Sequence, residues 1–275
     1  MTNKKIRGFK LLFLLLFKNP KKLTNGKLEA LLRARVHAIE KQGNIEETTD
    51  FLSMIWSRQL YHEAKKREIL SLEELEWCDN VLFGKKIKNE IRELSTSHQA
   101  QLLDIIKERR SIRSWQEGKL TKEEFELLVN AAKWAPSSSH RQPWHFLLTN
   151  DRDKIKMLSE FRDQKFVNGA PNCILALINL ETYNSEEVNY TPYLDAGAAI
   201  QNLLLMAHSM GFGACWVNFG KMEVPDDKME KTKNLFEIPK NFQIVSIIPI
   251  GKLNGKNPIA PGRKKTTDIL HIEKF

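Results

Sequence analysis

A change of pattern near residue 99 constrains the fold of this 275-residue chain more than any other feature of its sequence. Before it, from about Leu28 to Ser95, apolar and charged residues alternate at helical spacing, and no proline lies between Pro20 and Pro136. After it, helical segments alternate with β-branched apolar runs, which is typical of helices packed on a mixed sheet. The sequence therefore predicts a helical extension followed by a larger domain built on a sheet.

We divide the chain into a basic apolar N-terminal segment, 1–27, a helical extension, 28–98, and a sheet domain, 99–275. The extension is expected to hold three helices, broken near Gly43 and Gly84 and located at Leu28–Gln42, Thr48–Glu63 and Ser71–Phe83. Ser71 and Glu74 have the spacing of a capping box, in which side chain and backbone are paired reciprocally at a helix start.

In the sheet domain, helices are expected over Gln101–Arg110 and from a second capping box, Thr121–Glu124, to a stop at Pro136. We expect Asp195 to cap a long helix over Ala196–Met210, which the following glycines end. The strand candidates are Trp144–Thr149, Cys173–Leu180, Cys215–Phe219 and Phe242–Ile250.

The formal net charge of +9 would suit an anionic partner such as nucleic acid, but the charge is unevenly distributed. Residues 1–30 contain eight Lys and Arg and one Glu, so this segment carries +7 and leaves about +2 for all other residues. Because the body of the protein is nearly neutral, we expect no nucleic-acid partner.

An apolar run, Leu11–Phe17, lies inside the basic segment. Its seven residues are too few to cross a bilayer, which takes about 20, and Lys18–Lys21 after it does not fit a signal-peptide cleavage site. Two interpretations stay open. Residues 4–22 contact an anionic membrane surface peripherally, or the run is a short helix packed on the protein's own body.

The chain has three cysteines, Cys78, Cys173 and Cys215, which are too scattered for a disulfide framework or a CxxC site. This indicates a reducing, cytoplasmic compartment. The phosphate-loop, HExxH, GxSxG and paired-cysteine zinc patterns do not occur in the sequence. We therefore expect neither a metal site nor a nucleophilic side chain.

Three segments have compositions that suit ligand binding. Arg109–Arg113 offers three guanidinium groups and a hydroxyl, which match phosphate oxygens. Ala135–Trp144 is a polar loop whose hydroxyl, amide and N–H groups suit the edges of a flat heteroaromatic ligand. In Gly211–Phe219, small residues let a backbone approach a ligand plane. Each also has a plainer interpretation, as a solvated basic face, a turn, or a helix end followed by a strand.

Taken together and in order, these segments resemble the FMN-dependent nitroreductase family over roughly residues 102–275. The resemblance is carried by RRSIR, APSSSHRQPWHF, DAGAAIQNLLLMAHSMGFGACW and the closing IPIGKLNGKNPIAPGRKKTTDIL. It implies an α+β fold with a nitroreductase-like mixed or antiparallel sheet flanked by helices. The N-terminal helical extension is unusual for the family, and either a cover for the flavin slot or a support for a dimer would explain it. Function still has to be argued from the site.

The resemblance also implies which residues bind FMN. The phosphate, ribityl and pyrimidine side would be lined by Arg109, Arg110, Ser111 and Arg113. The C-terminal residues that would close on the phosphate are Arg263, Lys264 and Lys265. The loop that meets the flavin, partly from the partner subunit, supplies Pro136, Ser137, Ser138, His140 and Gln142. The strand edge whose backbone N–H points at flavin N5 comprises Trp216, Val217, Asn218 and Phe219.

Two positions depart from the family pattern. His140 stands where the family usually has Asn, and Asn218 with Phe219 stands where Glu-Gly or Gly-Gly is common. These departures affect contacts with the isoalloxazine ring and hence substrate choice. The variable loops Phe161–Asn168 and Glu181–Tyr193 are further candidates for substrate contacts.

The resemblance implies an oxidoreductase in which flavin N5 takes hydride from NADH or NADPH and a nitro, quinone or related small organic acceptor is then reduced. Two substrates that use one slot in turn predict ping-pong kinetics. No side chain is catalytic in this scheme: arginines stabilise the phosphate and the reduced flavin, and the protein orients the reactants. The family pattern also implies a homodimer with FMN at the interface.

Two alternatives stay open. One is a membrane-surface scaffold or assembly factor that keeps a flavin-binding fold and is membrane-peripheral through its basic N-terminus. The other is a flavin enzyme of altered chemistry in polysaccharide biosynthesis. The second is suggested by Arg35–Lys41, which resembles a segment of long nitroreductase-like proteins associated with that process.

Overall fold

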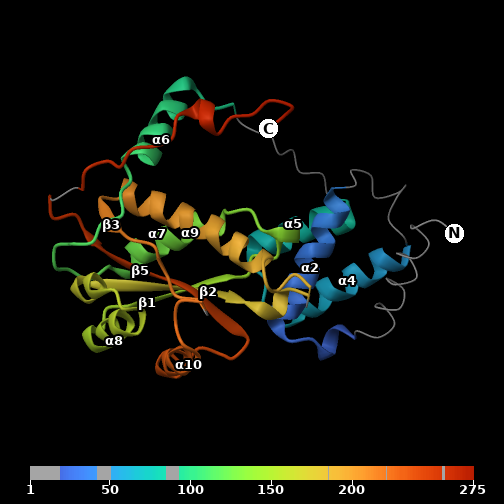
Figure 1. The fold of residues 1–275 in the computed structure, drawn as a ribbon. Helices are drawn as coiled ribbons and strands as arrows, with labels where there is room; N and C mark the ends of the chain where they lie inside the picture. The colour runs from blue at the N-terminus through green and yellow to red at the C-terminus, as the bar shows by residue number, and fades with distance from the viewer. Residues whose placement is uncertain (1–18, 42–50, 85–92, 185, 221, 256–257) are drawn as a thin grey trace.

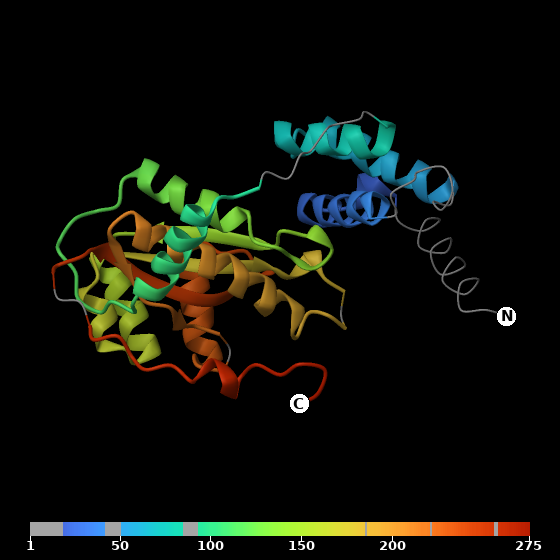
Figure 2. The same ribbon diagram turned by 90° about the horizontal axis from the view of Figure 1, so that it is seen from above.

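The computed structural model describes residues 19–41, 51–84, 93–184, 186–220, 222–255 and 258–275. The predicted apolar run, most of the basic segment and the expected break near Gly43 lie outside these residues. In the described part, a sheet is covered by helices on both faces, and a group of helices from the start of the chain lies at one end of the sheet (Figures 1 and 2).

We call helices α2, α4 and α5 the helical module; they span Asn25–Glu40, Phe51–Lys66 and Leu72–Phe83. They share a core of their own, in which Leu28, Leu32, Leu60 and Leu82 are fully buried. A short 3-10 helix, η1, precedes α2 at Pro20–Lys22.

The capping signals of the module behave as expected. The Ser71 side chain accepts the Glu74 N–H, and the Glu74 carboxylate accepts the Ser71 N–H, so the predicted capping box is confirmed. Gly84, at φ +71°, ends α5 in the left-handed conformation that favours glycine. Helix α2 starts earlier than predicted because Thr24 caps it through the Lys27 N–H.

The sheet of the second part has the strand order β1-β2-β5-β3, and β4 also pairs with β5. Every pairing between these named strands is antiparallel. The strands are β1 Trp144–Thr149, β2 Asn172–Asn179, β3 Phe212–Ala214, β4 Val217–Asn218 and β5 Phe242–Lys252. Strand β2 is buried along its whole length and β5 nearly so, as expected for strands covered on both faces. The α+β fold is therefore confirmed.

Each face of the sheet has its own apolar core. Helices α7 (Lys122–Lys133) and α9 (Thr191–Ser209) cover one face, with Leu128 and Leu203 fully buried. Helices α8 (Arg152–Arg162) and α10 (Asp226–Leu235) cover the other, with Leu158 fully buried. The short 3-10 helices are η2 Ser138–His140, η3 Lys165–Gly169, η4 Leu180–Thr182 and η5 Thr266–Asp268.

Helix α6, Thr96–Glu108, and the C-terminal segment extend from the body (Figure 1). None of the described residues of α6 is buried, and Leu102, Leu103 and Ile106 are about half exposed. The C-terminal Ile272 and Phe275 are exposed as well. Both segments therefore present apolar side chains that are not packed within this single chain.

Two expectations need correction, and two helices were missed. Asp195 does not cap α9, because the helix starts at Thr191 and Asp195 lies inside it with its carboxylate turned to a neighbouring loop. The expected strand Cys215–Phe219 is replaced by β3 and β4, which pair with different parts of β5. Helices α8 and α10 were not predicted. Across the part of the chain that the structure describes, no helix is long and apolar enough to cross a membrane.

Candidate functional site

The basic segment Arg109–Arg113 leaves the end of α6 and runs beside β3. Ser111 forms a parallel β-bridge with Ala214, and the Ile112 N–H donates to the Ala214 carbonyl at 3.1 Å. Gly213 allows this approach, because a Cβ there would lie 2.7 Å from three side-chain atoms of Ile112. Tertiary pairing thus brings together two of the segments that the sequence singled out.

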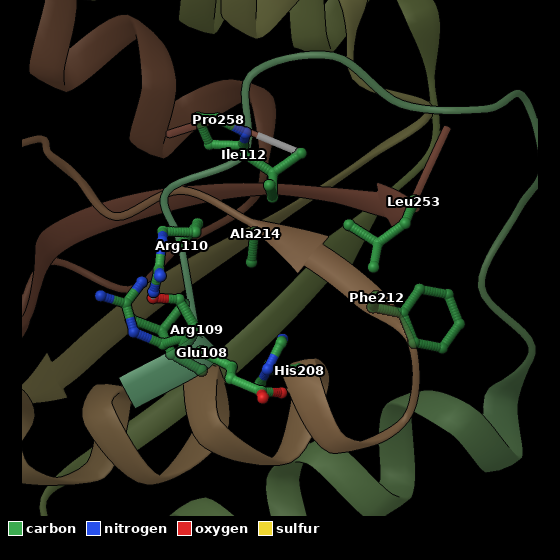
Figure 3. A pocket seen from close by; sticks show the side chains of 10 residues that line it. Glu108, Arg109, Arg110, Ile112, His208, Phe212, Ala214, Leu253 and Pro258 are labelled. Carbon is green, nitrogen blue, oxygen red and sulfur yellow. The ribbon is translucent and has the colours of Figure 1, made fainter. Parts of the chain in front are cut away.

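A cavity of about 260 Å³ lies on one side of this junction, between the basic segment and the end of α9 (Figure 3). Arg109 and Arg110 line it together with Glu108 and His208. Its other lining residues are Ile112, Leu204, Phe212, Ala214, Leu253 and Pro258. The cavity therefore combines an apolar wall with two guanidinium groups.

A second hollow, a groove of about 310 Å³, adjoins β4 and includes Arg113. The Arg113 guanidinium lies 5.4 Å from the centre of the Phe166 ring. Arg162 is fixed beside it, because its Nε donates to the Asn218 carbonyl at 2.6 Å. The remaining lining residues are Gln164, Cys215, Trp216 and Val217.

Arg162, Gln164 and Phe166 were not among the predicted site residues. They lie at the end of α8 and in the following turn, and only the packing of α8 against the sheet brings them to β4. The one sequence signal that points to them is the variable loop Phe161–Asn168, which was expected to contact substrate.

The electrostatics of the two hollows favour an anion. Four guanidinium groups line them, from Arg109, Arg110, Arg113 and Arg162, against the single carboxylate of Glu108 among the described lining residues. Arginine donors match phosphate oxygens and electron-rich carbonyl edges. The arrangement therefore suits a ligand that carries both.

Two titratable groups at the site stay uncharged near neutral pH. Burial raises the pKa of the Cys215 thiol, although nearby Arg113 and a Ser111 hydrogen bond act in the opposite direction. Burial lowers the pKa of His208, and Arg109 and the neighbouring Arg110 lower it further, against a raising effect of Glu108. A protonated, buried thiol is a poor nucleophile.

The predicted loop Pro136–Gln142 lies elsewhere in this single chain. It precedes β1 near the β2 residue Asn179, whose N–H donates to the Pro143 carbonyl at 2.8 Å. The Ser111–Ala214 bridge lies at the opposite end of the sheet, where Ala214 pairs with Ile250. One chain therefore does not bring Pro136, Ser137, Ser138, His140 and Gln142 to the groove.

The C-terminal basic residues are exposed. Within the described residues of one chain, no hydrogen bond or ion pair joins Arg263, Lys264 or Lys265 to the basic segment; Arg263 donates only to carbonyls of Pro261 and Gly262. Pro258, which precedes them in the same segment, does line the cavity.

Phe219 differs from its neighbours on the predicted strand edge. Its side chain is fully buried in the core, and its N–H donates to the Val245 carbonyl at 3.0 Å. Phe219 therefore offers no free donor to a ligand, whereas Trp216, Val217 and Asn218 line the groove. No cluster of potential metal ligands occurs among the residues that the structure describes.

Comparison with known proteins gives a consistent result. The model of the "Nitroreductase family" matches residues 106–165 and 157–252. A Methanothermobacter thermautotrophicus protein named "Putative NADH dehydrogenase/NAD(P)H nitroreductase" is 32% identical over 177 residues, which cover 63% of this chain and 87% of that protein.

Two solved structures are similar in fold. A Bacteroides thetaiotaomicron protein of the same name superposes with a TM-score of 0.55 at 30% identity, covering 64% of this chain and 98% of its own. A Desulfovibrio desulfuricans structure described as a "nitroreductase in complex with fmn" gives a TM-score of 0.52 at 28% identity, covering 63% and 97%. The residues that the family model matches lie in the sheet domain and not in the helical module.

Proposed function

Because the chain belongs to the nitroreductase family, we propose that it is an FMN-dependent oxidoreductase that takes hydride from NADH or NADPH and reduces a small organic acceptor, such as a nitro compound or a quinone. The observation that supports this most directly is the Ser111–Ala214 bridge, because it gathers the basic segment and the β3–β4 edge around one site. The same slot would serve both substrates, which predicts ping-pong kinetics.

The donor set of the two hollows fits FMN. Arg109 and Arg110 in the cavity suit a dianionic phosphate, and Arg113 in the groove suits the pyrimidine edge of a flavin. Gln164 and Arg162 add further donors beside Asn218. We propose that these residues hold the cofactor, together with Ser111 and the strand edge Trp216–Asn218.

The protein's own part in the reaction is to bind and orient. FMN, when bound, supplies the redox chemistry through hydride transfer at N5. The arginines stabilise negative charge on the bound group in a partly enclosed site, where such interactions are stronger than in water. Cys215 stays protonated because it is buried, so the site provides no thiolate to compete with the flavin chemistry.

We further propose that the site is completed in a homodimer. Helix α6 and the C-terminal segment leave Leu102, Ile106 and Phe275 unpacked in one chain, and a second copy would bury them. In such a dimer the partner's copy of the Pro136–Gln142 loop would reach the flavin, and Arg263 with Lys264 would close on the phosphate.

The test is a titration of the purified full chain with FMN and with riboflavin, followed by flavin fluorescence. We expect FMN to bind more tightly, because riboflavin lacks the phosphate that the arginines recognise. With the FMN complex, initial rates at varied NADH and quinone concentrations should give parallel double-reciprocal lines. A chain that shows no fluorescence change with FMN would disprove the proposal.

A further inference from the structure

The Pro136–Gln142 loop has an unusual backbone. Ser139, His140 and Gln142 have φ values of +50°, +55° and +50°, in the left-handed region that residues other than glycine adopt rarely. Conformations of this kind persist where the surrounding structure fixes them. The contacts around the loop therefore determine whether it keeps this shape.

The sheet domain fixes one side of the loop. The Asp195 carboxylate accepts the Ser138 N–H, and the Ser137 hydroxyl accepts the Gln142 N–H at 3.0 Å. These contacts hold the start and the end of the loop. The Arg141 guanidinium pairs with Glu187 at 3.0 Å, and Nε2 of the His140 ring lies 3.0 Å from the amide nitrogen of Gln142 within the loop itself.

The helical module also contacts the His140 ring, and it contacts the Arg141 carbonyl. The His140 ring lies edge-on to Trp77 of α5, with ring centres 5.0 Å apart, and 5.8 Å from the His37 ring of α2. The Arg33 guanidinium of α2 donates to the Arg141 carbonyl at 3.4 Å. The module thus adds contacts from α2 and α5 to those that the loop makes within the sheet domain.

Arg33 is well placed for this contact, because two ion pairs fix its orientation. Its guanidinium pairs with Glu29 at 2.9 Å and with Glu74 at 2.7 Å, and its side chain is 11% exposed. Glu74 is itself fixed by the capping box with Ser71. The restraint on the loop is therefore linked to the folded start of α5.

We propose that the helical module is a clamp on the Pro136–Gln142 loop, that Arg33 and Trp77 are its positioning residues, and that the module sets the affinity of the enzyme for FMN through this loop. The inference rests on the proposed function, in which the loop completes the flavin site of the partner subunit. It assigns a role to a part of the chain that lies outside the match to the family model.

The experiment compares full-length variants. Trp77→Leu removes the ring that contacts His140 and keeps an apolar side chain in the module. Arg33→Lys keeps the positive charge for Glu29 and Glu74 but loses the planar fork that also reaches Arg141. Glu73→Gln is the matched control, because Glu73 of α5 pairs with Lys133 of α7 at 3.5 Å and does not touch the loop.

Two quantities are measured: hydrogen exchange of the segment 136–142 without FMN, and the dissociation constant of FMN. Circular dichroism and thermal unfolding confirm that the module stays folded. We expect faster exchange of the loop in Trp77→Leu and Arg33→Lys. If the loop then keeps its FMN-binding conformation in only about a tenth of the molecules, the dissociation constant of FMN rises about tenfold. Glu73→Gln should change neither quantity.

The outcomes separate the clamp from the proposed function. Unchanged loop exchange in both folded variants would overturn the clamp. Faster exchange with an unchanged dissociation constant would overturn the link to FMN affinity, while the proposed function would stand. If the wild-type chain does not bind FMN, the proposed function and the link to affinity both fail, and the exchange data still decide whether the module restrains the loop.

Discussion

Both carboxylate oxygens of Asp195 accept the backbone N–H of Ser138, at 3.0 and 3.1 Å. The Tyr183 hydroxyl donates to the same carboxylate at 2.5 Å. Because Asp195 is 7% exposed, this network joins α9 to the Pro136–Gln142 loop inside the protein. A residue expected to start a helix instead anchors a loop that the proposed function places at the flavin.

Replacing Asp195 by Ala should lower the free energy of unfolding by about 1–3 kcal/mol, because it leaves the part-buried Ser138 N–H and the buried Tyr183 hydroxyl without this acceptor. Tyr183→Phe is the matched control, since it removes a single hydroxyl and should cost about 0.5–1.5 kcal/mol. Urea unfolding of both variants provides the measurement. Equal destabilisation by the two changes would contradict the anchoring role of Asp195.

Arg113→Ala should weaken FMN binding by about 1.5–3 kcal/mol, the range for a hydrogen bond to a charged group. A fluorescence titration measures the effect. The control is Lys122→Ala, which removes a positive charge from an 82% exposed side chain on α7, away from the groove. If both variants bind FMN as the wild type does, Arg113 is not part of the flavin site.

Gly213→Ala tests the contact that forms the site. The new Cβ would lie 2.7 Å from Ile112, so the basic segment must move, at a cost of about 1–3 kcal/mol for overpacking. We expect a lower melting temperature and weaker FMN binding. Gly169→Ala, whose Cβ would meet nothing within 4 Å, should leave FMN binding unchanged. If Gly213→Ala melts and binds FMN as the wild type does, the close contact between Ile112 and Gly213 is not needed to form the site.

The separate core of the helical module predicts that it unfolds as a unit of its own. Ser71→Ala removes the capping box of α5 and should destabilise the module by about 0.5–2 kcal/mol. Thr121→Ala makes the same change at the start of α7 in the sheet domain. In hydrogen exchange, Ser71→Ala should speed exchange of α5, and Thr121→Ala should speed exchange of α7. Equal effects of both changes on both helices would indicate one cooperative unit.

Folding stability should decrease below about pH 6.5 partly because of His140. Burial lowers the pKa of this residue, as do nearby His37 and Arg33, against raising effects of Glu40 and Glu74. Between this lowered pKa and the ordinary value of 6.5, the unfolded chain binds a proton that the folded chain does not. The contribution of His140 is therefore complete above pH 6.5 and is lost as the pH falls through that window.

The measurement is urea unfolding of the wild type and of His140→Gln at pH 7.5 and 5.5. The variant should lose less stability between these two pH values than the wild type does. An identical loss in both proteins would show that the His140 ring does not resist protonation in the folded state.

The sequence predicted best those elements whose ends are set by neighbouring residues, such as a capping residue at a helix start. Strand β1 was predicted with its observed bounds, and both capping boxes were located correctly. Helix α8 was not predicted, although Asp151 caps it in the usual way through the Asp153 and Lys154 N–H groups. The split between β3 and β4 could not be predicted from the sequence, because it depends on which part of β5 each strand pairs with.

The site was also predictable only in part, because tertiary packing and not local sequence brings its parts together. The motif order suggested that Arg109–Arg113 belongs with the strand edge after Gly211, and the Ser111–Ala214 bridge brings these segments together. Arg162 and Gln164 join the groove through the packing of α8 against the sheet, and the sequence pointed to them only as part of the variable loop Phe161–Asn168. The positions of Ser137 and Arg263 at the flavin stay predictions, because they belong to the proposed homodimer and not to one chain.

Helix α2 meets the sheet domain at a point where no side chain fits. A Cβ on Gly26 would lie 2.4 Å from the amide nitrogen of Asn179, so any other residue at position 26 would force this asparagine or the helix to move. Asn179 is 6% exposed, and its Oδ1 accepts hydrogen bonds from the Glu181 N–H and the Asn241 amide, so a side chain at position 26 would have to displace a group that is already fixed. The missing side chain at position 26 is therefore what lets the first helix of the module lie directly against the end of β2.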